Sequence, residues 1–258
     1  IAKGVTLTIP AGLTFSKLTA ASGAKIAFSA DPIGTVGGTL TLISVGQGAG
    51  VSDAFDLPPT YSVGVDAVSS AFTATRTSGT YTWTNAKEDN NWATSGNWKV
   101  DDFVVPEVPA AEDTVVFPAS DAEGFKAWTV TLPWDVYADT VTLNAAVELS
   151  GAWTLKAHTI NGSAELKLNN AHIGCNGMDM IVTCPLNILP ETTDYIYLMG
   201  YNAMLNGALY GSGKLVSDAN GAQYKGVTFK GDVSEFYGEF ESTKYNQRDA
   251  TNMTAPAI

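Results

Sequence analysis

The chain has 258 residues, of which 45% are apolar, so it can bury a substantial core as one elongated domain or two smaller ones. Its net charge is −12, from 14 basic and 26 acidic residues, which argues against nucleic acid and anionic membranes as partners because lysine and arginine must neutralise phosphate to bind them. Only 16% of the residues are charged, against about a quarter in typical domains, so threonine, serine, asparagine and backbone must cover the surface, as in extracellular all-β proteins.

The first section, residues 1–78, is rich in two-residue alternation of apolar and small polar side chains. Such runs occupy residues 5–9, 25–28, 39–43, 61–65 and 71–75. Alternation of this kind predicts short strands with one buried face, and threonine suits the pleated surface between them. Glycine pairs and residues 46–50 predict turns, and residues 53–60 predict a loop around two prolines. We therefore expect a β-strand-rich module over residues 1–78.

Residues 81–117 contain three of the six tryptophans, followed by an acidic, proline-spaced connector. They lie between the threonine-rich strands and a run of short apolar strands. Two roles are open for these tryptophans: a platform that stacks on a ligand, or a seal that packs on the core at the end of a coil. We expect the seal, and hence a structural junction between two modules. The junction residues are Trp83, Trp92, Trp98, Asp113 and Phe117.

The second module, residues 79–258, consists of short apolar strands separated by asparagine, glycine and proline. They are expected at residues 127–132, 139–143, 147–149, 153–155, 158–160, 164–168, 180–189, 195–200, 203–216, 226–229 and 236–241. The segments DTVVF, WTVTL, DTVTL and WTLKA look like variants of one unit, a loose internal repeat. Regular short strands predict an all-β fold, either a parallel β-helix (solenoid) with irregular coils or a β-sandwich.

The motifs of this module resemble those of a known family. The pattern W…NW…GNW ends at Trp98 and is followed by a proline and by DTVVF at residues 113–117. V-T-L strands follow at residues 130–132 and 141–143, and glycine motifs follow at residues 211–215 (GSGKL) and 226–238 (GVTFKGDVSEFYG). This is similar to bacterial autotransporter-like surface proteins with autotransporter-associated β-strand passenger repeats, and the likeness covers about two-thirds of the chain.

The resemblance implies a right-handed parallel β-helix that is exported to the bacterial cell surface. It also implies that residues 1–78 are the closing coils of a preceding passenger-like unit. The chain starts mid-pattern, so we expect it to be a mature or excised segment. No apolar run reaches the roughly 20 residues of a membrane helix, so we expect no membrane insertion by this chain.

Catalytic and metal-binding motifs are weak. Carboxylates gather at residues 88–89, 101–102, 107, 112–113, 121 and 123. They could hydrolyse glycosidic bonds, hold Ca²⁺ or form a solvated acidic face, and we expect the solvated face because no calcium-loop motif is present. His158 and His172 are too few for a three-histidine zinc site, and we expect ordinary strand and turn residues. Cys175 and Cys184 fit either one disulfide of an oxidising compartment or two unrelated buried thiols.

The expected function is passive: a structural or adhesive module of a secreted or cell-surface protein. Its partners would be other copies of itself, as in a self-assembling fibre, or neighbouring modules of the same polypeptide. No cofactor and no enzymatic activity are expected. The alternative is a carbohydrate-binding or carbohydrate-active β-helix, a lyase or hydrolase, since tryptophan and tyrosine stack well on sugars. The expected glycan or partner contacts are Trp134, Tyr195, Tyr197 and Tyr201.

Overall fold

The computed structural model describes residues 1–9, 11–28, 36–46, 48–49, 51, 54–66, 71–105, 107–219 and 225–243. These residues form short β-strands and no α-helix; a single 3-10 turn, η2 (Ser95–Asn97), stands among the named elements. The chain divides into a first unit, Ile1–Gly79 with Val100–Glu107, and a second unit, Thr80–Lys99 with Val108–Ile258. The return of Val100–Glu107 to the first unit is a feature that the sequence pattern does not indicate.

The first unit combines parallel and antiparallel pairing. Parallel pairs join β1 to β4, β2 to β5 and β3 to β6, whereas β5 to β8 and β8 to β7 are antiparallel. Its core is built on Ile26 and Ile43, both fully buried. The antiparallel pairs differ from a stack of coils, in which strands pair in parallel. Its strands are β1 (Thr6–Ile9), β2 (Leu13–Phe15), β3 (Leu18–Thr19), β4 (Lys25–Phe28), β5 (Thr39–Val45), β6 (Gly48–Ala49), β7 (Tyr61–Asp66), β8 (Ala71–Arg76) and β11 (Phe103–Val104).

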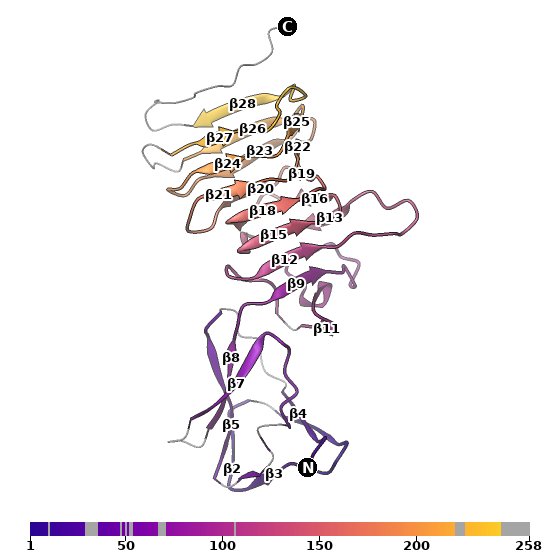
Figure 1. Ribbon diagram of the computed structural model, residues 1–258, viewed down its shortest axis with the longest axis vertical. Coiled ribbons are helices and arrows are strands. Elements are labelled where there is room, and N and C mark those ends of the chain that lie inside the picture. Colours follow the sequence, from indigo (N-terminus) through magenta and orange to yellow (C-terminus); the bar gives the residue numbers. More distant parts are fainter. Residues whose placement is uncertain are drawn as a thin grey trace. The chain divides into compact units, whose positions relative to one another are not determined.

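The second unit is a parallel β-solenoid in which each turn between Thr114 and Asp218 contributes one strand to each of three sheets (Figure 1). The first sheet contains β9 (Thr80–Trp83), β10 (Trp98–Val100), β12 (Thr114–Phe117), β15 (Thr140–Leu143), β18 (Thr159–Gly162), β21 (Met180–Val182), β24 (Ala203–Leu205) and β27 (Val227–Phe229). The second contains β13 (Trp128–Thr131), β16 (Val147–Ser150), β19 (Leu166–Asn169), β22 (Leu186–Ile188) and β25 (Leu209–Gly211). The third contains β14 (Val136–Tyr137), β17 (Thr154–Ala157), β20 (His172–Cys175), β23 (Thr193–Tyr197), β26 (Lys214–Asp218) and β28 (Glu239–Thr243).

The register explains why this sequence folds as a solenoid. Thr140 pairs with Thr159, 19 residues later, so the alternating pattern returns to the same face once per turn. Val115, Val141, Ile160 and Val182 therefore stack in one inward row, and each is fully buried. Burying a side chain of this size contributes about 1.5–3 kcal/mol. The predicted all-β solenoid is confirmed, and the parallel pairing of the three sheets from β12 to β28 excludes the β-sandwich.

The junction tryptophans form a closed aromatic cluster at the start of the second unit. Trp83, Trp92 and Trp98 are at most 1% exposed, and the rings of Trp83 and Trp92 each meet Trp98 at 4.8 Å in edge-on contacts. Phe117, fully buried, lies 6.0 to 6.3 Å from all three rings. The indole nitrogen of Trp98 donates to the carbonyl oxygen of Trp92 at 2.8 Å. The rings are thus core packing, with no exposed face for a ligand.

Two segments differ from the sequence-based prediction. Residues around His172 were expected to form a turn, but His172–Cys175 is strand β20. The bend lies earlier, at Asn170, whose φ of 52° is left-handed. All four residues of β20 are buried, so the strand lacks the alternation that would reveal it. Gly48–Ala49 is strand β6 rather than part of a turn. No helix within the described part of the chain is long and apolar enough to cross a membrane.

Candidate functional site

A groove with a volume of about 300 Å³ lies on the third sheet of the second unit. We call it the aromatic groove. Its apolar lining comes from Ala152, Trp153, Tyr197 and Met199. Trp153 is 48% exposed and Met199 is 41% exposed, whereas most large apolar side chains of this unit are fully buried. The groove is therefore a place where apolar area stays in contact with water beside polar groups.

The solenoid register brings the lining residues together. Lys156, Gly174, Tyr197 and Asp218 are partners on four successive turns of the third sheet. Thr154 and His172 pair in the same way one row away. Gly174 lets the turns on either side of it pack closely, because a Cβ there would lie 3.0 Å from the Thr154 methyl carbon and 3.1 Å from the Tyr197 carbonyl oxygen. Residues far apart in the sequence thus form one surface.

The polar lining of the groove is centred on an ion pair. Lys156 Nζ lies 2.7 Å from Asp135 Oδ2, and the Thr154 backbone N–H donates to Asp135 Oδ1 at 3.1 Å. Burial raises the pKa of Asp135, but the hydrogen bonds from Lys156 and Thr154 outweigh it, so the pKa lies below its ordinary value. Burial lowers the pKa of Lys156, but hydrogen bonds to Asp135 and Tyr137 outweigh it and raise the pKa. Both groups are therefore charged and compensate each other at neutral pH.

His172 and Tyr197 supply neutral polar groups. The backbone N–H of Tyr195 donates to His172 Nδ1 at 3.2 Å, which leaves Nε2–H as the ring's donor. Burial lowers the pKa of His172, and burial likewise raises the pKa of Tyr197. The imidazole is therefore uncharged and the phenol keeps its proton at neutral pH. Tyr195 stacks parallel to Tyr197, with ring centres 5.4 Å apart, and holds the second ring in place.

Of the four aromatic residues expected to contact a glycan or partner, Tyr197 alone lines the groove. Tyr195 supports it, Tyr201 follows the turn after β23 and is half-buried, and Trp134 is 54% exposed beside Asp135. Trp153 is one of the six tryptophans that could stack on a sugar, but the sequence-based prediction of these contacts preferred Trp134. The signal for it was the spacing: Val136 pairs with Leu155, so Trp134 and Trp153 occupy equivalent positions on consecutive turns.

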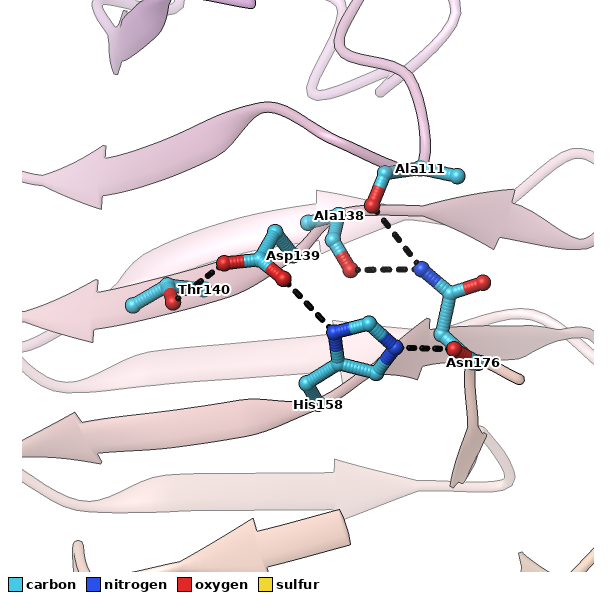
Figure 2. Close-up of polar contacts among 6 residues, drawn as sticks. All are labelled: Ala111, Ala138, Asp139, Thr140, His158 and Asn176. Carbon is cyan, nitrogen blue, oxygen red and sulfur yellow. Dashed lines mark hydrogen bonds and ion pairs between the residues drawn. The ribbon is translucent and has the colours of Figure 1, made fainter. Parts of the chain in front are cut away.

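A polar peg joins four successive turns at the corner between the third and first sheets. His158 Nδ1 lies 2.6 Å from Asp139 Oδ1 on the preceding turn, and Nε2 contacts the carbonyl oxygen of Asn176 on the next turn (Figure 2). The Asn176 amide donates back to the carbonyl oxygens of Ala111 at 2.9 Å and Ala138 at 3.1 Å. Each ring nitrogen of His158 therefore contacts an oxygen on a different turn. The arrangement is a structural bridge.

Replacing His158 with alanine should lower the free energy of unfolding of the second unit by about 2 kcal/mol, because two hydrogen bonds of about 1 kcal/mol each are lost. His158→Asn keeps a polar side chain that can make one of the two hydrogen bonds. Its free energy of unfolding should lie between those of the alanine variant and the wild type. Urea unfolding followed by circular dichroism measures both. A loss below about 0.5 kcal/mol for the alanine variant would show that the peg is dispensable.

Asp194 is a carboxyl group inside the core. It is fully buried in β23, where Oδ1 accepts from the Ala171 N–H at 2.9 Å and Oδ2 accepts from the Thr192 hydroxyl at 2.6 Å. Burial raises the pKa of Asp194 above its ordinary value, more than these hydrogen bonds lower it. A raised pKa means that the folded state binds the proton more tightly than the unfolded state. The wild type therefore gains stability from this group as pH falls from the raised pKa to the ordinary value near 3.8.

We therefore expect the free energy of unfolding of Asp194→Asn, minus that of the wild type, to be higher at neutral pH than at acid pH. The amide keeps the acceptor for Ala171 and carries no charge into the core. Urea unfolding of both proteins at pH 7 and at about pH 4 gives the comparison. Asp121→Asn, in an exposed loop, is the matched control for the loss of one negative charge outside the core. A pH-independent difference for Asp194→Asn would contradict an ionised buried carboxylate.

Of the two alternatives left open for the cysteines, the structure has two buried thiols and no disulfide between them. Cys175 ends β20, Cys184 lies between β21 and β22, and both are buried free thiols. Cys175 Sγ donates instead to the carbonyl oxygen of Asn202 at 3.5 Å. Burial raises the pKa of Cys175 to about 11 and that of Cys184 to about 12, so neither is a reactive thiolate at neutral pH.

The acidic residues singled out in the sequence lie in different parts of the structure, and several make structural hydrogen bonds. Asp89 accepts from Thr94 at 2.6 Å and from the Asn97 amide at 2.6 Å, and these bonds lower its pKa and hold the tryptophan loop. Asp113 is buried beside the junction, where its carboxylate accepts from the Ala110 N–H at 2.7 Å. Glu107 is buried in the first unit and accepts from Thr60 at 2.7 Å. Within the described residues, no three histidine, cysteine or acidic side chains gather where they could hold a metal ion.

Comparison with known proteins assigns no relationship: no protein-family model, curated protein or solved structure matches the chain. The likeness to autotransporter-associated repeats stays a prediction from the motifs.

Proposed function

We propose that this chain is an adhesive and structural module of an exported cell-surface protein. The observation that carries the proposal is the second unit itself, a rigid stack of parallel turns whose inward rows are continuous and fully buried. Such a stack transmits force through its backbone ladder and presents flat side faces for contact. The low charged fraction and the passenger-like motifs of residues 83–117 and 226–238 support an extracellular setting.

Antibodies raised against the purified chain test the location. They should label intact cells of the source organism as strongly as permeabilised cells. Labelling that appears only after permeabilisation would overturn the proposal. Beads coated with the chain should also be retained on glycoprotein-coated surfaces under flow more than beads coated with an unrelated protein of equal negative charge. Equal retention of the two kinds of beads would contradict the adhesive role in this proposal.

Self-association is part of the proposal, because the last described turn leaves apolar side chains partly uncovered. Phe229 and Phe240, on strands β27 and β28, meet at 5.0 Å but stay partly exposed, whereas Leu205 and Leu215 one turn earlier are at most 2% exposed. A further coil, from a neighbouring module or another copy, would cover this row. Light scattering should show the mass rising with concentration, and a constant monomer mass would contradict self-association.

Carbohydrate binding is the second candidate function, and the aromatic groove is the observation that favours it. The groove joins exposed aromatic and thioether surface to fixed polar groups, the combination that sugars require.

A further inference from the structure

We propose that the aromatic groove binds a neutral oligosaccharide, stacked on Trp153 and Tyr197 and hydrogen-bonded by the Asp135–Lys156 pair and His172. This inference rests on the proposed adhesive role and names the chemical class of ligand that the module would hold. It concerns binding and involves no covalent step.

The first argument is the exposed apolar rim. Trp153 is 48% exposed, although Trp83, Trp92 and Trp98 in the same unit are at most 1% exposed. Met199, also on the rim and 41% exposed, has a left-handed φ of 50°, a conformation that residues other than glycine rarely adopt. Apolar surface held in water next to fixed polar groups is the usual composition of a ligand site. A sugar ring presents the matching surface, an apolar face edged by hydroxyls.

The second argument is the mixture of donors and acceptors. Asp135 offers carboxylate acceptors, His172 offers Nε2–H as a donor, and the Tyr197 hydroxyl does both. A sugar hydroxyl is both donor and acceptor, so adjacent hydroxyls can satisfy this set. The groups are held in advance by the Asp135–Lys156 ion pair at 2.7 Å and by the stacking of Tyr195 on Tyr197. Their order lowers the entropy lost on binding.

The third argument is charge. Lys156 is the basic residue of the lining, and its charge is compensated by Asp135, while Asp218 adds a further carboxylate. The whole chain carries a net charge of −12. Nothing in the described lining attracts an anion, so uronic acids and sulfated sugars are disfavoured and a neutral sugar is selected.

The fourth argument is size. A volume of about 300 Å³ is at the lower end of the range of about 300–1,000 Å³ for small-ligand sites, which suits a single sugar ring at a time. Trp134, 54% exposed, occupies the position equivalent to Trp153 on the preceding turn. Neighbouring strands lie about 4.8 Å apart, close to the length of one sugar residue in a chain. An oligosaccharide running from turn to turn can therefore stack on both tryptophans.

The test is a printed array of neutral and acidic oligosaccharides, followed by calorimetric titration of the best-binding neutral tetrasaccharide. Trp153→Ala should weaken its binding about tenfold or more, since a lost stacking contact is worth about 1.4 kcal/mol. Trp153→Phe retains an aromatic face and should recover part of the affinity. Tyr237→Ala removes another aromatic side chain, one that is 78% exposed and outside the groove, and should bind like the wild type.

Circular dichroism and the thermal midpoint establish that each variant is folded. Three results would overturn the inference: no binding to any glycan on the array, binding of acidic glycans alone, or wild-type affinity of Trp153→Ala for the tetrasaccharide. These results are separate from the location test: surface labelling of intact cells with a blank array would leave the exported module in place and remove the neutral-glycan groove. Labelling only after permeabilisation would remove the exported module, whatever the array shows.

Discussion

Replacing Trp98 with alanine should lower the free energy of unfolding of the second unit by about 3–5 kcal/mol, the usual range for deleting a buried aromatic side chain. Trp98 is fully buried at the centre of the junction, where its ring meets Trp83 and Trp92 at 4.8 Å and Phe117 at 6.3 Å. Its indole N–H also donates to Trp92 at 2.8 Å, so the variant loses a hydrogen bond as well as packing. Both losses fall on the first turn of the solenoid.

Trp134→Ala is the matched control, because the side chain is the same and is 54% exposed. Its effect on stability should stay within about 0.5 kcal/mol. Trp98→Phe preserves an apolar ring, so its free energy of unfolding should fall by less than that of Trp98→Ala. Urea unfolding monitored by near-ultraviolet circular dichroism follows the aromatic cluster directly. Equal effects of Trp98→Ala and Trp134→Ala would mean that the junction cluster does not stabilise the second unit.

The strands of the solenoid are readable in the sequence because the inward rows of side chains are aliphatic. Val141 and Leu143 alternate with threonines, and Ile160 returns to the row of Val141 after 19 residues. The alternation predicts the strands, whereas the loose repeat is compatible with both a solenoid and a β-sandwich. Strand β20 could not be predicted in this way, because its outward residues are buried as well. The rings of Tyr195 and Tyr197 cover His172. Alternation of apolar and polar residues identifies a strand only where one of its faces is exposed to solvent.

The aromatic groove is less predictable than the fold for a different reason. Its lining comes from five turns, so it has no local motif, and its position depends on which residue of each turn pairs with which. A shift of one residue would turn Lys156 inward and Leu155 outward. The choice of Trp134 over Trp153 illustrates this point: both lie in exposed corners one turn apart, and only the folded arrangement shows that Trp153 borders the groove.

Gly207→Ala should destabilise the second unit by about 3 kcal/mol or more, at the upper end of the range for overpacking. The cause is backbone proximity between turns. A Cβ at Gly207 would overlap the carbonyl oxygen of Cys184 and lie 2.8 Å from that of Thr183. Neither obstacle is a flexible side chain that can move aside. The pattern repeats one turn later, where a Cβ at Gly231 would overlap the carbonyl oxygen of Gly207. The glycine motif at residues 226–238 thus has a physical basis at Gly231.

Gly226→Ala makes the same chemical change with the opposite expected sign. Nothing lies within 4 Å of a Cβ at Gly226, and its φ is outside the left-handed range, so alanine should stabilise by about 0.4–1 kcal/mol through the lower entropy of the unfolded chain. Urea unfolding of the two variants beside the wild type gives the comparison. If both substitutions shift stability in the same direction by similar amounts, close contact between successive turns does not determine where this solenoid requires glycine.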